Sequence, residues 1–114
     1  MEMISPTLHG NLDYITVVLF LVAPTFIGLT GIAGIIAYAL AGIHPAMTLV
    51  TDFPLGAAKL LPFTVHGWVE RVVGPVLVLL PFGHGFDALA RGFYIVIGIV
   101  IILAGLLTDY GRTQ

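Results

Sequence analysis

The chain has 114 residues, of which 59% are hydrophobic and only 9% are charged, and its mean hydropathy is +1.10. A soluble domain of this size cannot bury so much apolar surface, so we expect an integral membrane protein embedded in a lipid bilayer. A formal net charge of -2 with four Lys and Arg residues argues against nucleic-acid binding, and the lack of cysteine excludes disulfides, thiolate catalysis and cysteine-ligated metal centres.

The apolar segments predict four membrane-spanning helices in a single membrane domain, residues 1–114. No Asp, Glu, Lys or Arg lies between Tyr14 and Thr51, and this run is long enough for two spans of about 20 residues each. Pro24, together with the glycines and threonine that follow it, predicts a tight turn between these two spans. The four helices are expected at about 11–27, 30–50, 66–82 and 88–109. The predicted fold class is therefore all-α, a polytopic membrane protein.

The two halves of the chain repeat the same polar and turn residues at a constant offset. "TLHGNLD" (7–13) falls on "TVHGWVE" (64–70) when the halves are written in register without a gap. Apolar helices match by accident at Leu and Val, but not easily at His, Gly, Pro and Asp together, so the pattern predicts a tandem repeat of one helical hairpin. Repeat one covers 8–53, the linker 54–64 and repeat two 65–110. The matching pairs are His9 and His66, Gly10 and Gly67, Asp13 and Glu70, Pro24 and Pro81, Gly28 and Gly85, Thr51 and Thr108, Asp52 and Asp109, and Phe53 and Tyr110.

Two helices in each repeat make the repeats parallel, because the second repeat then begins on the same side of the membrane as the first. We expect a pseudo-twofold axis along the membrane normal. Both termini and the linker share one face, together with Lys59, Arg71 and Arg112, whereas Arg91 alone lies on the opposite face. The excess of positive charge predicts that the first face, and so both termini, are cytoplasmic.

The segment "LVTDFPLGAAKLLPFTVHGWVE" (49–70) resembles the SPW-repeat family of small bacterial integral membrane proteins. In that family two-helix repeats are joined by a Thr-Asp-aromatic stretch leading to a Pro and a His, and the resemblance covers about residues 8–110. The matching tripeptides Ala23-Pro24-Thr25 and Leu80-Pro81-Phe82 keep only the proline of Ser-Pro-Trp, which makes the chain a divergent member. The resemblance implies two hairpin repeats in a bacterial cytoplasmic (inner) membrane and no established catalytic chemistry.

Two His/carboxylate pairs are the main candidate site. His9 and Asp13 are four residues apart, as are His66 and Glu70, so each pair shares one helix face. In a structural interpretation the carboxylates lie near helix N-termini, where the dipole favours them, and the histidines cap or bond to them. In a functional interpretation His9 and His66 approach across the axis and bind haem, chlorophyll or another metal, while the carboxylates orient the rings.

Other residues are assigned structural roles. Asp52 and Asp109 follow the second and fourth helices, and we hypothesise that Asp52 fastens the linker to the third. The prolines of the matching pairs, Pro24 and Pro81, mark equivalent helix ends. A stripe of small residues on the second helix predicts close helix packing, and it consists of Ala33, Ala37 and Ala41. His44, His84 and the spaced pair Asp87 and Arg91 are weaker candidates, the last for an ion pair at the headgroups.

The motifs of common enzymes are absent, so we expect a protein that is not an enzyme. The favoured function is a non-catalytic structural or accessory subunit that packs against a larger membrane complex or against itself as a homo-oligomer, with no cofactor. The alternative is a small transport or cofactor-binding protein that uses the repeated His/carboxylate pairs, with haem or chlorophyll as the cofactor.

Overall fold

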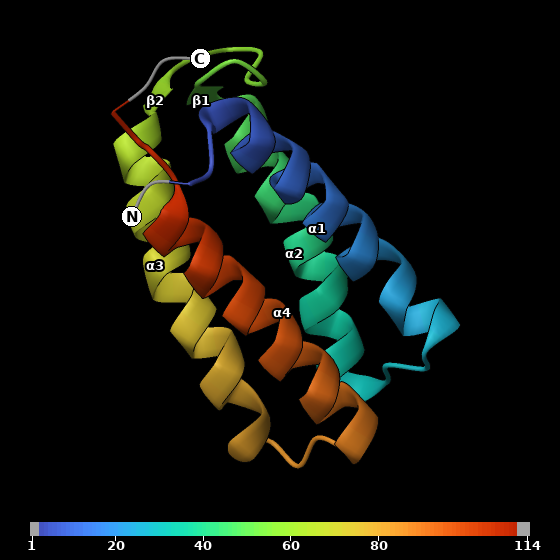
Figure 1. The fold of residues 1–114 in the computed structure, drawn as a ribbon. Coiled ribbons are helices and arrows are strands. Elements are labelled where there is room, and N and C mark those ends of the chain that lie inside the picture. Colours follow the sequence, from blue (N-terminus) through green and yellow to red (C-terminus); the bar gives the residue numbers. More distant parts are fainter. Residues whose placement is uncertain (1–2, 112–114) are drawn as a thin grey trace.

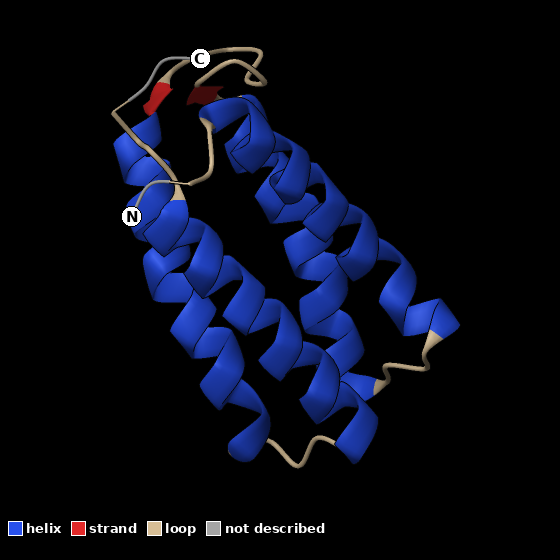
Figure 2. Cartoon of the chain, in the orientation of Figure 1, coloured by secondary structure: helices blue, strands red, loops and turns tan. Residues whose placement is uncertain are grey.

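The computed structural model describes residues 3–111, which form four helices arranged as two antiparallel hairpins (Figure 1). Each of the four is long and apolar enough to cross a membrane. Figure 2 shows that most of the described chain is helical, with two short strands near the end of the bundle where α1 and α3 begin. The elements are α1 (Pro6–Phe26), α2 (Gly31–Leu49), β1 (Thr51–Asp52), β2 (Leu61–Pro62), α3 (Phe63–Leu79), the 3-10 turn η1 (Leu80–Phe82) and α4 (Ala88–Leu107).

The predicted helices are present, but α1 and α3 begin earlier than the sequence patterns indicated. Ser5 is the N-cap of α1, and its side chain accepts a hydrogen bond of 3.2 Å from the Leu8 amide. Pro6 follows at the first helical position, where a proline loses no hydrogen bond. In α3 the helix starts directly after Pro62. As a result His9 and His66 lie one turn inside their helices, not at the ends.

The turn between α1 and α2 spans residues 27–30 and is slightly longer than the expected helix bounds left, because α1 ends at Phe26 and α2 begins at Gly31. Gly28 and Gly31 both have positive φ angles, 73° and 57°, and make the reversal that a side chain would oppose. Pro81 lies in η1 after the end of α3, so the two matched prolines are not in identical surroundings.

Within each hairpin the helices pack closely, α1 on α2 and α3 on α4. The α3–α4 approach depends on two glycines, because a Cβ atom on Gly98 would lie only 2.9 Å from the carbonyl oxygen of Gly74. Small residues at such a crossing let two backbones come together in lipid. Gly74 and Gly98 therefore allow the close contact between α3 and α4.

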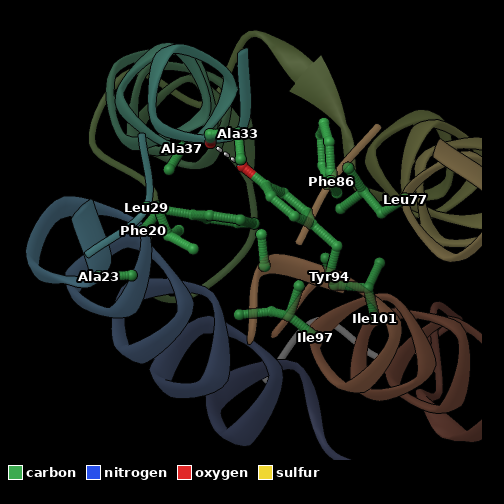
Figure 3. Close-up of a cluster of buried hydrophobic side chains, with 11 residues drawn as sticks. Phe20, Ala23, Leu29, Ala33, Ala37, Leu77, Phe86, Tyr94, Ile97 and Ile101 are labelled. Atoms are coloured by element: carbon green, nitrogen blue, oxygen red, sulfur yellow. Dashed lines mark hydrogen bonds between the residues drawn. The ribbon is translucent and has the colours of Figure 1, made fainter. Parts of the chain in front are cut away.

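An apolar core joins the two hairpins, and Tyr94 lies at its centre (Figure 3). The Tyr94 side chain is fully buried, and its hydroxyl donates a hydrogen bond of 2.6 Å to the Ala33 carbonyl of α2. Ala33 and Ala37 are buried in this core, and Ala41 packs against it half-buried. The alanine stripe therefore faces the interior, where small side chains leave room for the aromatic ring of the opposite hairpin.

At the end of the bundle where α1 and α3 begin, each hairpin is tied by backbone pairing to the segment that precedes the other hairpin. Strand β1 pairs in parallel with β2, with Thr51 opposite Leu61, while Ile4 forms an equivalent bridge with Thr108. The backbone hydrogen bonds also match, since Leu61 N–H donates to Val50 and Ile4 N–H donates to Leu107, at 2.8 and 2.9 Å. Thr108 follows Thr51, and Leu61 follows Ile4, by the same sequence offset that relates His66 to His9. Arg112, counted in the charge comparison, lies outside the described residues.

Candidate functional site

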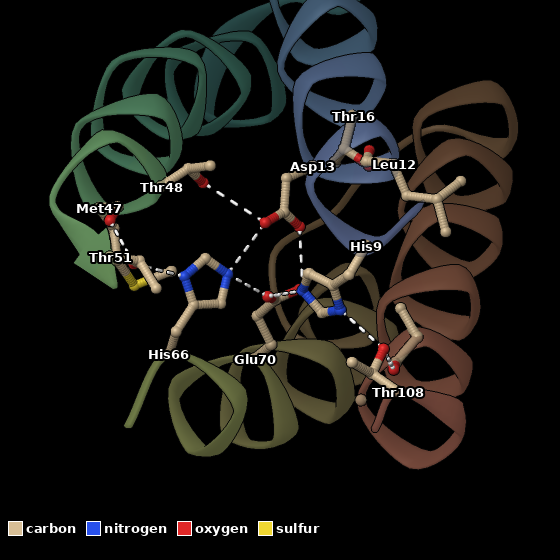
Figure 4. Close-up of polar contacts among 12 residues, drawn as sticks. His9, Leu12, Asp13, Thr16, Met47, Thr48, Thr51, His66, Glu70 and Thr108 are labelled. Atoms are coloured by element: carbon tan, nitrogen blue, oxygen red, sulfur yellow. Dashed lines mark hydrogen bonds and ion pairs between the residues drawn. The ribbon is translucent and has the colours of Figure 1, made fainter. Parts of the chain in front are cut away.

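Four ionisable side chains from the two hairpins meet inside the bundle, one to two turns from the end that carries the linker. His9 and Asp13 come from α1, and His66 and Glu70 come from α3 (Figure 4). One ligand atom of each residue lies within 4.8 Å of the others. All four residues are at most 3% exposed. The sequence paired each histidine with a carboxylate, and the structure joins the two pairs into one cluster.

Each carboxylate of the cluster touches both imidazole rings. The Nε2 atom of His9 lies 2.7 Å from Glu70 Oε1 and 3.3 Å from Asp13 Oδ1. The Nε2 atom of His66 lies 2.5 Å from Glu70 Oε1 and 3.0 Å from Asp13 Oδ2. These contacts cross between the hairpins in a reciprocal way, as expected for two halves related by a twofold axis.

Two threonines determine which ring nitrogen faces the centre. Thr108 donates its hydroxyl proton to the Ala104 carbonyl at 2.5 Å, so its oxygen is left to accept from His9 Nδ1 at 2.7 Å. Thr51 repeats the arrangement by donating to the Met47 carbonyl at 2.6 Å and accepting from His66 Nδ1 at 2.8 Å. A hydroxyl has one proton, so Nδ1 must carry the hydrogen in both rings. Both Nε2 atoms therefore point at the carboxylates.

The inward nitrogen of the His66 ring has no hydrogen-bond partner in the described part of the chain. Its Nε2 atom is fully buried and makes no hydrogen bond of suitable angle, although two carboxylate oxygens are close enough. The nitrogen is thus directed into the space between the carboxylates and not along a bond to either one. In metal centres a ligating histidine likewise donates its second ring N–H to a fixed acceptor while the other nitrogen faces the ion.

The charge of the cluster requires compensation. Asp13 and Glu70 together bring two negative charges into an interior that is otherwise apolar, and an uncompensated buried charge is strongly unfavourable there. Lys59, Arg71 and Arg91 donate instead to backbone carbonyls, those of Phe53, Gly105 and Phe86. Protons on the two inward Nε2 atoms, or one divalent cation, would supply the two positive charges that neutralise both carboxylates.

A third histidine approaches the cluster from α2. His44 is 8% exposed, and its Nε2 atom lies 3.4 Å from Asp13 Oδ1 without a hydrogen-bond partner. Ile101 occupies the equivalent position in α4 and is also buried. His44 therefore breaks the symmetry of the site. His84 does not take part, because it is exposed in the turn at the other end of the bundle.

Three aromatic side chains cover the histidines on the side of the linker and termini. Phe63 meets the His9 ring edge-on at 5.3 Å, Tyr110 lies 5.6 Å from the same ring, and Phe53 lies 6.0 Å from His66. We call Phe53, Phe63 and Tyr110 the aromatic cap. Burial raises the pKa of the Tyr110 phenol, and the negative charge of Glu70 adds to this shift.

The glycine after each histidine makes room for this cap. A Cβ atom on Gly67 would lie 2.5 Å from the Tyr110 ring, and one on Gly10 would lie 2.8 Å from the Phe53 ring. The two His-Gly dipeptides thus have the same explanation: the histidine belongs to the cluster, and the glycine leaves space for an aromatic ring of the cap. Arg71 holds the cap from outside, with its guanidinium 5.2 Å from the Tyr110 ring centre.

The structural interpretation of the carboxylates is wrong in one respect. Asp13 and Glu70 are the eighth residues of helices that begin at Pro6 and Phe63, whereas the helix dipole acts mainly within the first turn. Their position is explained by the histidines that they contact. Sequence reasoning attached no role to Thr51 and Thr108, although both appeared among the matched pairs.

The remaining predicted residues lie away from the cluster. The Asp52 side chain is exposed, and the linker is fastened by backbone bonds, among them Leu60 N–H to Val50 at 2.8 Å. Asp109 accepts from the Gly111 amide at 3.1 Å. Asp87 caps α4 by accepting from Ala90 N–H at 2.8 Å, and the predicted ion pair with Arg91 does not form among residues 3–111, because Arg91 bonds to the Phe86 carbonyl.

Comparison with known proteins adds no assignment, because no protein-family model, curated protein or solved structure matches the chain. The resemblance to the SPW-repeat family accordingly stays a prediction from the sequence.

Proposed function

We propose that this protein is a four-span integral membrane protein that binds one divalent transition-metal ion at the cluster of His9, Asp13, His66 and Glu70. The observation that carries the proposal is the pair of threonine hydroxyls, which direct both Nε2 atoms at two buried carboxylates. Two neutral imidazoles and two carboxylates carry two negative charges, which one divalent cation neutralises.

The donor set narrows the choice of ion. Two nitrogens and two carboxylate oxygens suit iron(II), manganese(II), cobalt(II) or zinc, whereas copper(I) prefers sulfur ligands, and calcium and magnesium prefer oxygen alone. Thr51 and Thr108 would act as the outer acceptors that hold ligating rings in place.

The geometry favours a bare ion over haem or chlorophyll. The His9 and His66 ring centres are 5.4 Å apart, and the carboxylates fill the space in front of both Nε2 atoms at 2.5 to 3.3 Å. A tetrapyrrole needs an open flat slot beside its axial ligand, and these carboxylates occupy it. We therefore retain the cofactor-binding alternative from the sequence for a metal ion, and not for haem or chlorophyll.

We further propose that the bundle arose by tandem duplication of one hairpin and lies in a bacterial inner membrane with both termini cytoplasmic. The reciprocal pairings of Thr51 with Leu61 and of Ile4 with Thr108 support the duplication, as do the crossed contacts of the two His/carboxylate pairs. We retain a non-catalytic accessory role in a larger membrane complex or homo-oligomer as the setting in which the ion is bound.

The direct test is the metal content of the protein purified in mild detergent, measured by inductively coupled plasma mass spectrometry after exposure to each candidate ion and removal of excess. We expect one ion per chain in the wild type and loss of the ion in the His9→Ala/His66→Ala double variant. His84→Ala is the matched control, since His84 is an exposed turn residue, and it should keep the ion. Equal metal content in all three proteins would overturn the proposal.

A further inference from the structure

A small apolar cavity adjoins the cluster on one side only. It has a volume of about 70 Å³, lies between α2 and α3, and is lined by His44 and Glu70 and otherwise by apolar side chains. Two of these, Ile43 and Val69, are 64% and 38% exposed on the outer surface of the bundle. The cavity thus connects a lipid-facing surface to two polar side chains of the site.

The opposite side of the bundle lacks this connection. The equivalent groove, between α1 and α4, is larger, about 460 Å³, but neither Asp13 nor a histidine lines it. Ile101, the residue equivalent to His44, is buried and does not line this groove; its side chain lines the smaller cavity between α2 and α3. The departure from twofold symmetry therefore brings the third histidine and the cavity to the same side of the cluster.

We infer that this cavity admits a small apolar molecule, of the size of dioxygen or nitric oxide, from the lipid to the ion at the cluster. The inference rests on the proposed metal function. A mostly apolar wall disfavours water and hydrated ions, whereas apolar guests occupy such cavities readily. A volume of about 70 Å³ exceeds the roughly 30 Å³ share of one water molecule and is well below the roughly 150 Å³ of a cavity that holds benzene.

The position of the cavity agrees with this assignment. Metal centres that bind an external ligand keep one coordination position free of protein. Glu70 both lines the cavity and belongs to the cluster, and His44 Nε2 faces Asp13 from the cavity side without a partner. A guest in the cavity would therefore meet the ion between these two side chains.

The test uses nitric oxide as the probe on the iron(II)-loaded protein under anaerobic conditions. Binding is followed by the electron paramagnetic resonance signal of a ferrous nitrosyl centre, and its rate by stopped-flow absorbance. Val69→Phe narrows the rim of the cavity, and we expect nitric oxide to bind about tenfold more slowly or worse, an increase of about 1.4 kcal/mol in the barrier. Leu12→Phe places the same change at the equivalent position of the other groove and should leave the rate unchanged.

A second pair of variants tests the same comparison in case Val69→Phe or Leu12→Phe does not fold. Ile43→Phe and Val100→Phe are likewise equivalent positions on the two sides, and both residues are exposed. Iron content is measured for every variant. An iron-loaded wild type that gives no nitrosyl signal, or equal rates in each matched pair, would overturn the inference while leaving the metal site intact. A protein that takes up no iron, manganese, cobalt or zinc would refute the proposed function and this inference with it.

Discussion

Thr108 accepts a hydrogen bond of 2.7 Å from Nδ1 of His9, although the two residues lie near opposite ends of the chain. Because the threonine proton is donated to Ala104, the bond fixes the ring with Nε2 directed at Glu70. Thr51 does the same for His66. The orientation of both candidate ligands therefore depends on residues that follow α2 and α4 and belong to the other half of the chain.

Replacing Thr108 by Val keeps the shape of the side chain and removes the acceptor. The Nδ1 proton of His9 is then buried without a partner, and we expect metal affinity to fall about 10- to 100-fold, as for other outer-shell changes. Affinity is measured by competition with a coloured chelator. Thr16→Val is the control, because buried Thr16 bonds only to the Leu12 carbonyl. Unchanged affinity in Thr108→Val would show that ring orientation does not depend on this bond.

Gly67→Ala should destabilise the aromatic cap. The new methyl group would lie 2.5 Å from the Tyr110 ring, and overpacking of this kind costs roughly 1–3 kcal/mol. We expect a lower melting temperature in detergent and faster loss of the bound ion. Gly92→Ala is a helical control with nothing within 4 Å of the added atom, and it should be neutral or slightly stabilising. If both variants melt alike, Tyr110 does not pack on Gly67 as described.

Tyr94→Phe tests the bond that joins the hairpins. Loss of the 2.6 Å hydrogen bond to Ala33 leaves a buried carbonyl with one acceptor position unused, which we expect to cost about 0.5–1.5 kcal/mol. Thermal unfolding in detergent measures the change. Tyr38→Phe is the matched control, because Tyr38 is 51% exposed. Equal stability of the two variants would argue that packing of the ring, and not its hydroxyl, holds the hairpins together.

Stability should decrease at alkaline pH because of Tyr110. Burial raises the pKa of its phenol above the unfolded value of about 10. The unfolded chain then loses this proton at lower pH than the folded one, so stability is complete below about pH 10 and falls as the pH rises toward the folded pKa. Melting curves at several pH values should show a shallower alkaline decline for Tyr110→Phe than for wild type. A decline of the same slope in both proteins would assign it to other groups.

The sequence predicted the number of helices, because hydropathy is a local feature of the chain, whereas the duplication of one hairpin stays a prediction. The sequence misplaced the starts of α1 and α3, since the Ser5-Pro6 cap lies outside the apolar run that defined the first helix. That error put Asp13 and Glu70 at helix ends and concealed how deeply they are buried.

The cluster itself is a product of packing between the hairpins, which spacing along one helix cannot reveal. His9 and Glu70 meet only because α1 and α3 face each other across the bundle. His44 ranked among the weaker candidates, because Ile101 occupies the matching position in the second half of the chain. The matched threonines were visible in the sequence, but their role depends on the distance to the histidines.

The most direct test of the metal centre is extended X-ray absorption fine structure at the metal edge of protein loaded with zinc or iron(II). The proposed site predicts nitrogen and oxygen ligands at about 2.0–2.2 Å, with the outer scattering pattern of at least two imidazole rings. The rings should disappear from the spectrum of the His9→Ala/His66→Ala variant. A shell of oxygen atoms without imidazole scattering would mean that the ion binds elsewhere, and the cluster would then be a proton-neutralised contact between two hairpins.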